Sequence, residues 1–154
     1  MKQRFRALVE LKGEMNLKPE QKEPLKVILD SNALFVPFQF RIDIFSELER
    51  LLKRRFELVL LSAVKKELEI LAEKGSPKIR KDAFCALKFS ERCRLVKVAT
   101  SISALTDDII VEVAREWNAL VFTNDKLLRG RLRDISVPVV YVRQNSRLEI
   151  DGIV

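Results

Sequence analysis

The chain has 154 residues, of which 47% are hydrophobic and 33% charged, a composition typical of one globular domain and not of a disordered segment. No apolar stretch approaches the roughly 20 residues of a membrane span, and the N-terminus lacks a signal-peptide core, so we expect a cytoplasmic protein with no membrane partner. There is no histidine, and the spacing of Cys85 and Cys93 fits neither a metal-binding nor a disulfide pattern. The net charge of +7 favours a polyanionic partner, with simple solubility as the alternative.

Residues 1–24 are polar and charged and are interpreted as a basic N-terminal arm before a domain over 25–154. Helical spacing of Phe5, Leu8 and Val9 predicts a short helix in this arm. From residue 26 onward, short apolar runs alternate with amphipathic segments. The apolar runs predict strands at 26–30, 56–61, 94–98, 119–123 and 137–142. The amphipathic segments predict helices at 45–53, 62–72, 77–92, 106–118 and 126–133, with Ser62 and Ser76 as N-caps.

This alternation predicts an α/β protein, with a mainly parallel sheet covered by helices on both faces. Ligands of such sheets bind outside the carboxyl ends of the strands, where the strand order reverses. Asp30 closes the first predicted strand and Asp125 follows the fourth, so they face each other if those strands are neighbours. Asp107 begins the preceding helix on its apolar side, whereas Asp108 is turned toward solvent. Glu67 lies at the edge of the apolar face of its own helix.

Four carboxylates without histidine indicate a site for hard divalent cations, not for zinc. One or two Mg²⁺ or Mn²⁺ ions held in this way support phosphoryl chemistry. Each position also has an ordinary structural interpretation: a turn at Asp30, a helix cap at Asp125, a dipole partner at Asp107 and a boundary ion pair at Glu67. The hypothesis of a metal site therefore depends on the four positions taken together.

The segments around these four acids resemble the four motifs of PIN-domain nucleases, in the same order over about residues 26–142. The segments are Asp30-Ser31-Asn32, Val64-Lys65-Lys66-Glu67-Leu68, Asp107-Asp108-Ile109-Ile110 with Ala114, and Thr123-Asn124-Asp125. The last two segments, together with residues 137–143, look most like the archaeal and eukaryotic PIN proteins of pre-ribosomal RNA processing. Toxin-type PIN ribonucleases share the same acidic set.

The resemblance implies a three-layer α/β/α sandwich with a five-stranded parallel sheet in the order 3-2-1-4-5. It also implies an endoribonuclease that uses Mg²⁺ or Mn²⁺, with the catalytic and metal-binding residues Asp30, Glu67, Asp107 and Asp125. Asn32 and Thr123 are then expected to orient these carboxylates from behind, with Asp108 as an accessory candidate.

RNA is the partner that the resemblance implies, and a homodimer and ribosome-assembly factors are further candidates. Basic residues offer phosphate contacts, although solvated helix faces explain them equally well: Arg129, Arg131, Arg133, Lys78, Arg80 and Lys81. Phe35, Phe38 and Phe40 are expected in a loop after the first strand, where they pack the core or form a subunit contact. Two other functions stay open, namely a PIN domain kept as an RNA-binding or assembly scaffold and the toxin of a toxin–antitoxin pair.

Overall fold

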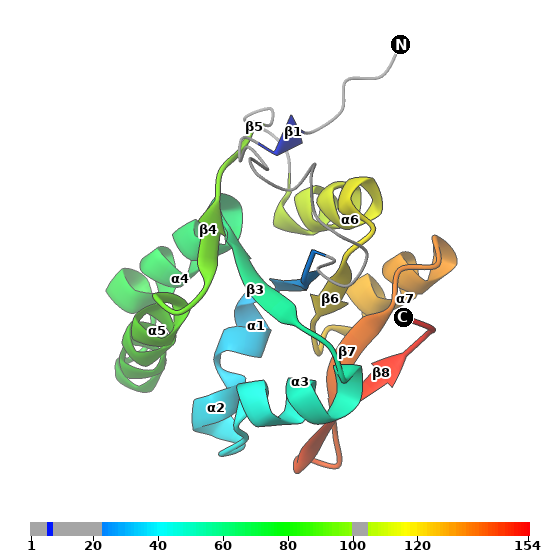
Figure 1. The fold of residues 1–154 in the computed structure, drawn as a ribbon. Coiled ribbons are helices and arrows are strands. Elements are labelled where there is room, and N and C mark those ends of the chain that lie inside the picture. Colours follow the sequence, from blue (N-terminus) through cyan, green and yellow to red (C-terminus); the bar gives the residue numbers. More distant parts are fainter. Residues whose placement is uncertain (1–5, 8–22, 100–104) are drawn as a thin grey trace.

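The computed structural model describes residues 6–7, 23–99 and 105–154, and its main sheet has the spatial order β4-β3-β2-β6-β7-β8 (Figure 1). In chain order the strands are β2 (Leu25–Leu29), β3 (Phe56–Leu61), β4 (Arg94–Val96), β6 (Leu120–Phe122), β7 (Val139–Arg143) and β8 (Arg147–Asp151). The first five pair in parallel, whereas β8 runs antiparallel to β7. The predicted strand order 3-2-1-4-5 is confirmed, and the sheet has one more strand than predicted.

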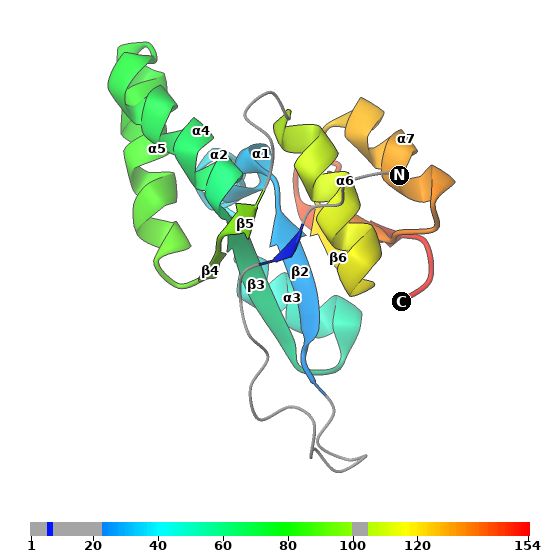
Figure 2. The ribbon, with the colours of Figure 1, turned by 90° about the horizontal axis from the view of Figure 1, so that it is seen from above.

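Helices lie on both faces of this sheet, as predicted. They are α1 (Ser31–Leu34), α2 (Val36–Gln39), α3 (Ile44–Leu52), α4 (Ser62–Lys74), α5 (Pro77–Ser90), α6 (Thr106–Trp117) and α7 (Lys126–Asp134). Figures 1 and 2 place α6 against one face and α3 against the opposite face, while the α4–α5 hairpin lies beyond the β4 edge. Within the described part of the chain, each helix is too short or too polar to cross a membrane.

Two local predictions after the first and second strands are wrong. Residues 31–39, expected as a loop, form the short helices α1 and α2, with Phe35 buried and Phe38 40% exposed. Leu61, not Ser62, is the N-cap of α4, because Ser62 already lies in the first turn and makes no capping bond. Ser76 does cap α5, through an acceptor contact with the N–H of Ile79.

The predicted strand over 94–98 is divided at Lys97 into β4 and a second short strand, β5 (Val98–Ala99). β5 pairs antiparallel with β1 (Arg6–Ala7). The helix expected around these two N-terminal residues is therefore wrong at Arg6 and Ala7, and its other positions, Phe5, Leu8 and Val9, lie outside the described residues.

Two central strands anchor the core. Val27, Ile28 and Leu29 of β2 are fully buried, and so are β6 residues such as Phe122. Burying one such side chain contributes about 1.5–3 kcal/mol. Because β2 and β6 are hydrogen-bonded neighbours, their carboxyl ends are held side by side in the middle of the sheet.

Candidate functional site

Asp30 directly follows β2 and is only 5% exposed. Its N–H donates to the carbonyl of Phe122 at 3.0 Å, which joins the ends of β2 and β6. Its Oδ1 accepts from the N–H of Ser31 at 2.8 Å, and its Oδ2 accepts from Asn32 Nδ2 at 3.0 Å and from Thr123 Oγ1 at 2.7 Å. These three donors hold both oxygens in place and compensate for burying a carboxylate.

Thr123 connects Asp30 to the acidic residue that follows β6. Its fully buried hydroxyl donates to Asp30 and accepts from the N–H of Asp125 at 3.1 Å. Asn32 braces the same connection, because its Nδ2 lies 3.3 Å from Thr123 Oγ1 and its Oδ1 accepts from the N–H of Asn124 at 2.9 Å. Asn32 and Thr123 therefore contact both the Asp30 carboxylate and the backbone of the loop that carries Asp125.

Asp125 caps α7, since its Oδ1 accepts from the N–H groups of Leu127 at 2.8 Å and Leu128 at 3.2 Å. No other residue that the structure describes bonds to its Oδ2, so one oxygen of this carboxylate is left for a ligand. The loop itself is fixed by Asn124, whose Oδ1 accepts from the N–H of Val142 at 2.8 Å. Asp125 can thus serve as both a helix cap and a site residue.

Glu67 reaches the same edge from α4. The side chains of Thr106 and Ser31 act to lower the pKa of its carboxyl by hydrogen bonding, and Ser31 adjoins Asp30. Burial raises the pKa of the Glu67 carboxyl, and repulsion from Asp30 and Asp107 raises it further, against the opposing effect of the two hydrogen bonds. Ser31 and Thr106 were missed as supports for Glu67, although each lies next to an acidic motif residue.

Asp107 lies in the first turn of α6. Burial raises the pKa of its carboxyl, as do the negative charges of Asp30 and Asp125, while Arg131 acts in the opposite direction. With the coupling of Glu67 to both Asp30 and Asp107, the four acids share one region of negative charge at the carboxyl edge of the sheet.

Asp108 is turned away from this region, as its position on the helix predicts. Its Oδ1 accepts from Arg131 Nη2 at 2.8 Å, and about half of each side chain is exposed. The structure therefore uses Arg131, a candidate RNA contact, in an exposed ion pair beside the site.

The other basic candidates lie in two places. Arg129 and Arg133 both pair with Asp151, at 2.9 Å and 3.2 Å. Lys78, Arg80 and Lys81 begin α5, at the tip of the α4–α5 hairpin that points away from the sheet (Figure 2), and Lys78 pairs there with Asp82 at 3.1 Å.

A hollow of about 290 Å³ lies beside the fourth acidic motif, Thr123-Asn124-Asp125. Its lining residues include Thr123 and Asn124 from the motif and Lys126 and Arg129 from α7, together with Tyr141. The Arg129 guanidinium stands 3.8 Å from the centre of the Tyr141 ring. Planar cationic and aromatic groups of this kind contact RNA bases and phosphates. Neither Lys126, which directly follows Asp125, nor Tyr141, which only the fold brings to the motif, was predicted from the sequence.

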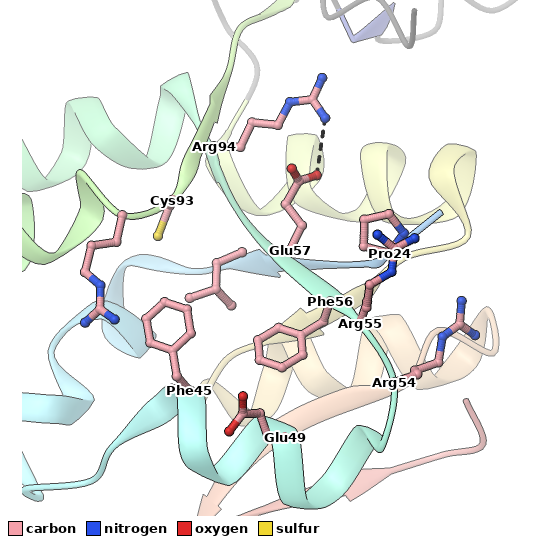
Figure 3. Close-up of a pocket in the computed structure, with 11 residues that line it drawn as sticks. Pro24, Phe45, Glu49, Arg54, Arg55, Phe56, Glu57, Cys93 and Arg94 are labelled. Carbon is pink, nitrogen blue, oxygen red and sulfur yellow. Dashed lines mark hydrogen bonds and ion pairs between the residues drawn. The ribbon is translucent and has the colours of Figure 1, made fainter. Parts of the chain in front are cut away.

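A second hollow, of about 770 Å³, lies at the other end of the strands (Figure 3). It is lined by residues at the amino ends, including Pro24 before β2, Phe56 of β3 and Arg94 of β4. The acidic residues thus lie at one edge of the sheet and this second hollow lies at the opposite edge.

The parallel sheet with acids at its carboxyl edge is the architecture of an α/β nuclease-like domain. A family model described as a PIN-like domain matches residues 27–145. Ribonuclease VapC4 of Methanocaldococcus jannaschii is 34% identical over 130 residues, which are 84% of this chain and 98% of that protein. The chain therefore belongs to the PIN-like domain family.

Other relatives agree with this assignment. Ribonuclease VapC9 of Archaeoglobus fulgidus is 26% identical over 124 residues, 80% of this chain and 87% of that protein. The solved structure of the PIN domain endonuclease Utp24 aligns with a TM-score of 0.70 and 28% identity, covering 85% of this chain and 94% of that one. VapBC2 from Rickettsia felis, solved with a DNA fragment from its promoter, aligns with a TM-score of 0.57 at 18% identity, over 77% of this chain and 100% of that one, and shares the fold.

Proposed function

We propose that this chain is an endoribonuclease that depends on Mg²⁺ or Mn²⁺. The observation that carries the proposal is the shared negative charge of Asp30, Glu67, Asp107 and Asp125 at one edge of the sheet. The relatives named ribonucleases and the endonuclease Utp24 support it, because two of them align over more than nine-tenths of their own length.

The donor set fits a hard cation in its chemistry. All four side chains are carboxylates, and burial, followed by repulsion from neighbouring acids, raises the pKa values of Glu67 and Asp107. Among the residues that the structure describes, however, no three acidic or thiol side chains are already gathered around a point that could hold a metal ion. We therefore assign the four carboxylates as the groups that would hold one or two ions, and infer that their side chains draw together on binding.

A bound divalent cation supplies positive charge to a phosphodiester and makes water a stronger nucleophile. The chain's own residues supply position and substrate binding. Asn32 and Thr123 keep Asp30 oriented, and Thr123 keeps the backbone of Asp125 in register with it. Lys126 and Arg129 line the adjacent hollow, where they can neutralise RNA phosphates next to the cleaved bond.

The test is a cleavage assay on labelled single-stranded and structured RNAs, with Mn²⁺ or with EDTA. We expect wild type to cut RNA only with the metal, and Asp107→Asn to lose activity by at least about 100-fold. Asp134→Asn, an exposed carboxylate at the end of α7, is the matched control and should cut as wild type does. Full cleavage by the double variant Asp30→Asn/Asp107→Asn would overturn the proposal.

A non-catalytic RNA-binding or assembly scaffold is the second candidate. The absence of a preassembled cage among the described carboxylates favours it. It predicts that wild type binds RNA without cutting it and that Mn²⁺ leaves the melting temperature unchanged. The complete acidic set favours the nuclease.

Within the nuclease proposal, the RNA target distinguishes ribosomal RNA processing from a toxin-type role. Both share one chemistry, and the chain resembles both Utp24 and VapC ribonucleases. Sequencing the 5′ ends made in total RNA separates them, because processing predicts cuts at pre-ribosomal sites and a toxin predicts cuts in mature RNAs. A homodimer and ribosome-assembly factors are part of the same proposal, to be tested by sedimentation and by co-purification.

A further inference from the structure

The hollow at the amino ends of the strands has no part in the proposed cleavage, yet its walls are rich in guanidinium groups. Four arginines line it, from the turn before β3, the turn before β4 and the start of β4 itself: Arg54, Arg55, Arg92 and Arg94. Glu49 and Glu57 are the acidic residues among the lining side chains. Arginine therefore outnumbers carboxylate two to one around this hollow.

An aromatic floor lies between these arginines (Figure 3). The rings of Phe45 from α3 and Phe56 from β3 are stacked, with centroids 6.3 Å apart and planes inclined by 28°. Both side chains are partly exposed. The Arg92 guanidinium lies 4.2 Å from the centre of the Phe45 ring, so the cation and the aromatic surface form one continuous wall.

Arg54 and Arg94 are held in position by hydrogen bonds to the protein. Arg94 Nη1 donates to Glu57 Oε1 at 3.2 Å, as Figure 3 shows, and Arg54 Nη2 donates to the carbonyl of Glu23 at 3.2 Å. The guanidinium of Arg92, by contrast, is an exposed group held through ring contacts with Phe45 and Phe89. Positioned cations beside exposed rings are the combination that binds single-stranded nucleic acid, with phosphates on the cations and bases on the rings.

We propose that this hollow is a second binding site for single-stranded RNA, remote from the acidic edge. Pro24 and Asp30 stand at opposite ends of β2, and at about 3.3 Å per residue they are roughly 20 Å apart along the strand. RNA bound here is therefore held outside the cleavage site and contributes affinity without chemistry. The choice of RNA as ligand rests on the proposed function. The aromatic floor favours RNA over an acidic protein segment, which has no bases to stack.

The test is a metal-free titration of a short fluorescein-labelled oligouridylate, followed by fluorescence anisotropy at several salt concentrations. Arg92→Gln removes one positive charge from the hollow, and Arg115→Gln removes one from an exposed position on α6. We expect Arg92→Gln to weaken binding roughly five- to tenfold and to reduce the salt slope by about 0.7 for each lost phosphate contact. Arg115→Gln should match wild type.

Glu57→Gln provides the opposite test, because it removes a negative charge from the hollow and releases Arg94. We expect tighter RNA binding, by about twofold or more, a gain that misfolding cannot produce. Equal affinities of Arg92→Gln and Arg115→Gln, or no gain for Glu57→Gln, would overturn the proposal. Displacement of the RNA by polyglutamate as readily as by unlabelled RNA would also overturn it, in favour of an acidic protein segment.

The outcome is independent of cleavage. An Arg92-specific loss of binding without any nuclease activity would support this site and contradict the proposed function. Metal-dependent cleavage with identical RNA binding by both arginine variants would do the reverse.

Discussion

Asp30 and Asp107 bear the same charge at one edge of the sheet, but the protein holds them in opposite ways. Asp30 accepts three hydrogen bonds, from Ser31, Asn32 and Thr123, so its burial is compensated. The pKa of Asp107 is raised by burial and by the charges of neighbouring acids, so its ionised form is unfavourable in the folded state. The Asp30 carboxylate stabilises the fold. The Asp107 carboxylate destabilises it but adds negative charge to the acidic edge of the sheet.

This contrast predicts opposite effects of the same substitution in EDTA. Asp30→Asn should lower stability by about 1–3 kcal/mol, because an amide N–H then faces groups that donate. Asp107→Asn should raise the melting temperature at neutral pH by roughly 2–4 °C, the response of a domain of this size to about 1 kcal/mol. Thermal unfolding followed by circular dichroism measures both.

The pH dependence of the Asp107 effect has a defined sign. When folding raises the pKa of a carboxyl, the group does not destabilise the protein at a pH below its ordinary pKa, where it is protonated. The free energy of unfolding then falls as the pH rises through the pKa of the folded state. The advantage of Asp107→Asn should therefore shrink toward about pH 4, near the ordinary pKa of aspartate. An advantage that grows on acidification would contradict this account.

At the scale of elements, β8 fastens the C-terminal end of the chain to α3. Leu148 is fully buried, its N–H donates to Glu47 Oε1 at 2.9 Å, and its carbonyl accepts from Arg50 Nη2 at 3.0 Å. Glu47 and Arg50 also pair with each other at 3.0 Å. Side chains of α3 thus satisfy backbone groups of β8, the strand at this edge of the sheet.

Leu148→Ala should reduce the free energy of unfolding by about 2–4 kcal/mol, since it leaves a cavity between β8 and α3. Glu47→Gln should cost less, because the amide retains an acceptor oxygen. The hydrogen bonds from Arg50 and from the Leu148 backbone lower the pKa of Glu47, so its contribution is present above its ordinary pKa and is lost as the pH falls through the folded value.

Urea unfolding at neutral and acidic pH tests these expectations, with Glu69→Gln, an exposed position on α4, as the control. The difference between wild type and Glu47→Gln should disappear in acid, whereas the Leu148→Ala deficit should remain. A pH-independent Glu47→Gln effect would remove the ionic part of this explanation.

At the scale of the whole molecule, the proposed metal site would couple metal binding to folding, because only the folded chain brings the four acids to one edge of the sheet. Mn²⁺ should raise the melting temperature of wild type, by an amount equivalent to about 2.7 kcal/mol at a concentration one hundred times the dissociation constant. Asp107→Asn starts from a higher melting temperature in EDTA and should gain less from Mn²⁺. Calorimetry with and without EDTA checks this, and an equal gain in both proteins would place the metal elsewhere.

The sequence by itself determined the approximate positions of the parallel strands and the alternation of strands with helices. A buried strand and an amphipathic helix each leave a local periodic pattern that can be recognised without the fold. The positions of three of the four acids follow from the same pattern, because Asp30, Asp107 and Asp125 lie where a strand ends or a helix begins, whereas Glu67 lies inside α4, at the edge of its apolar face. Neighbouring β2 and β6 then bring Asp30 next to the Thr123–Asp125 loop.

Only the tertiary structure decided features that depend on contacts between distant segments. β8 alternates charged and apolar residues, a pattern that fits a half-exposed strand, but its place beside β7 and the contact with α3 depend on distant segments. The supports of Glu67 and the arginine-rich hollow bring together residues from separate elements. Local periodicity reports whether a side chain is buried, whereas which atoms meet is set by how the layers pack, and that information is not contained in any one segment.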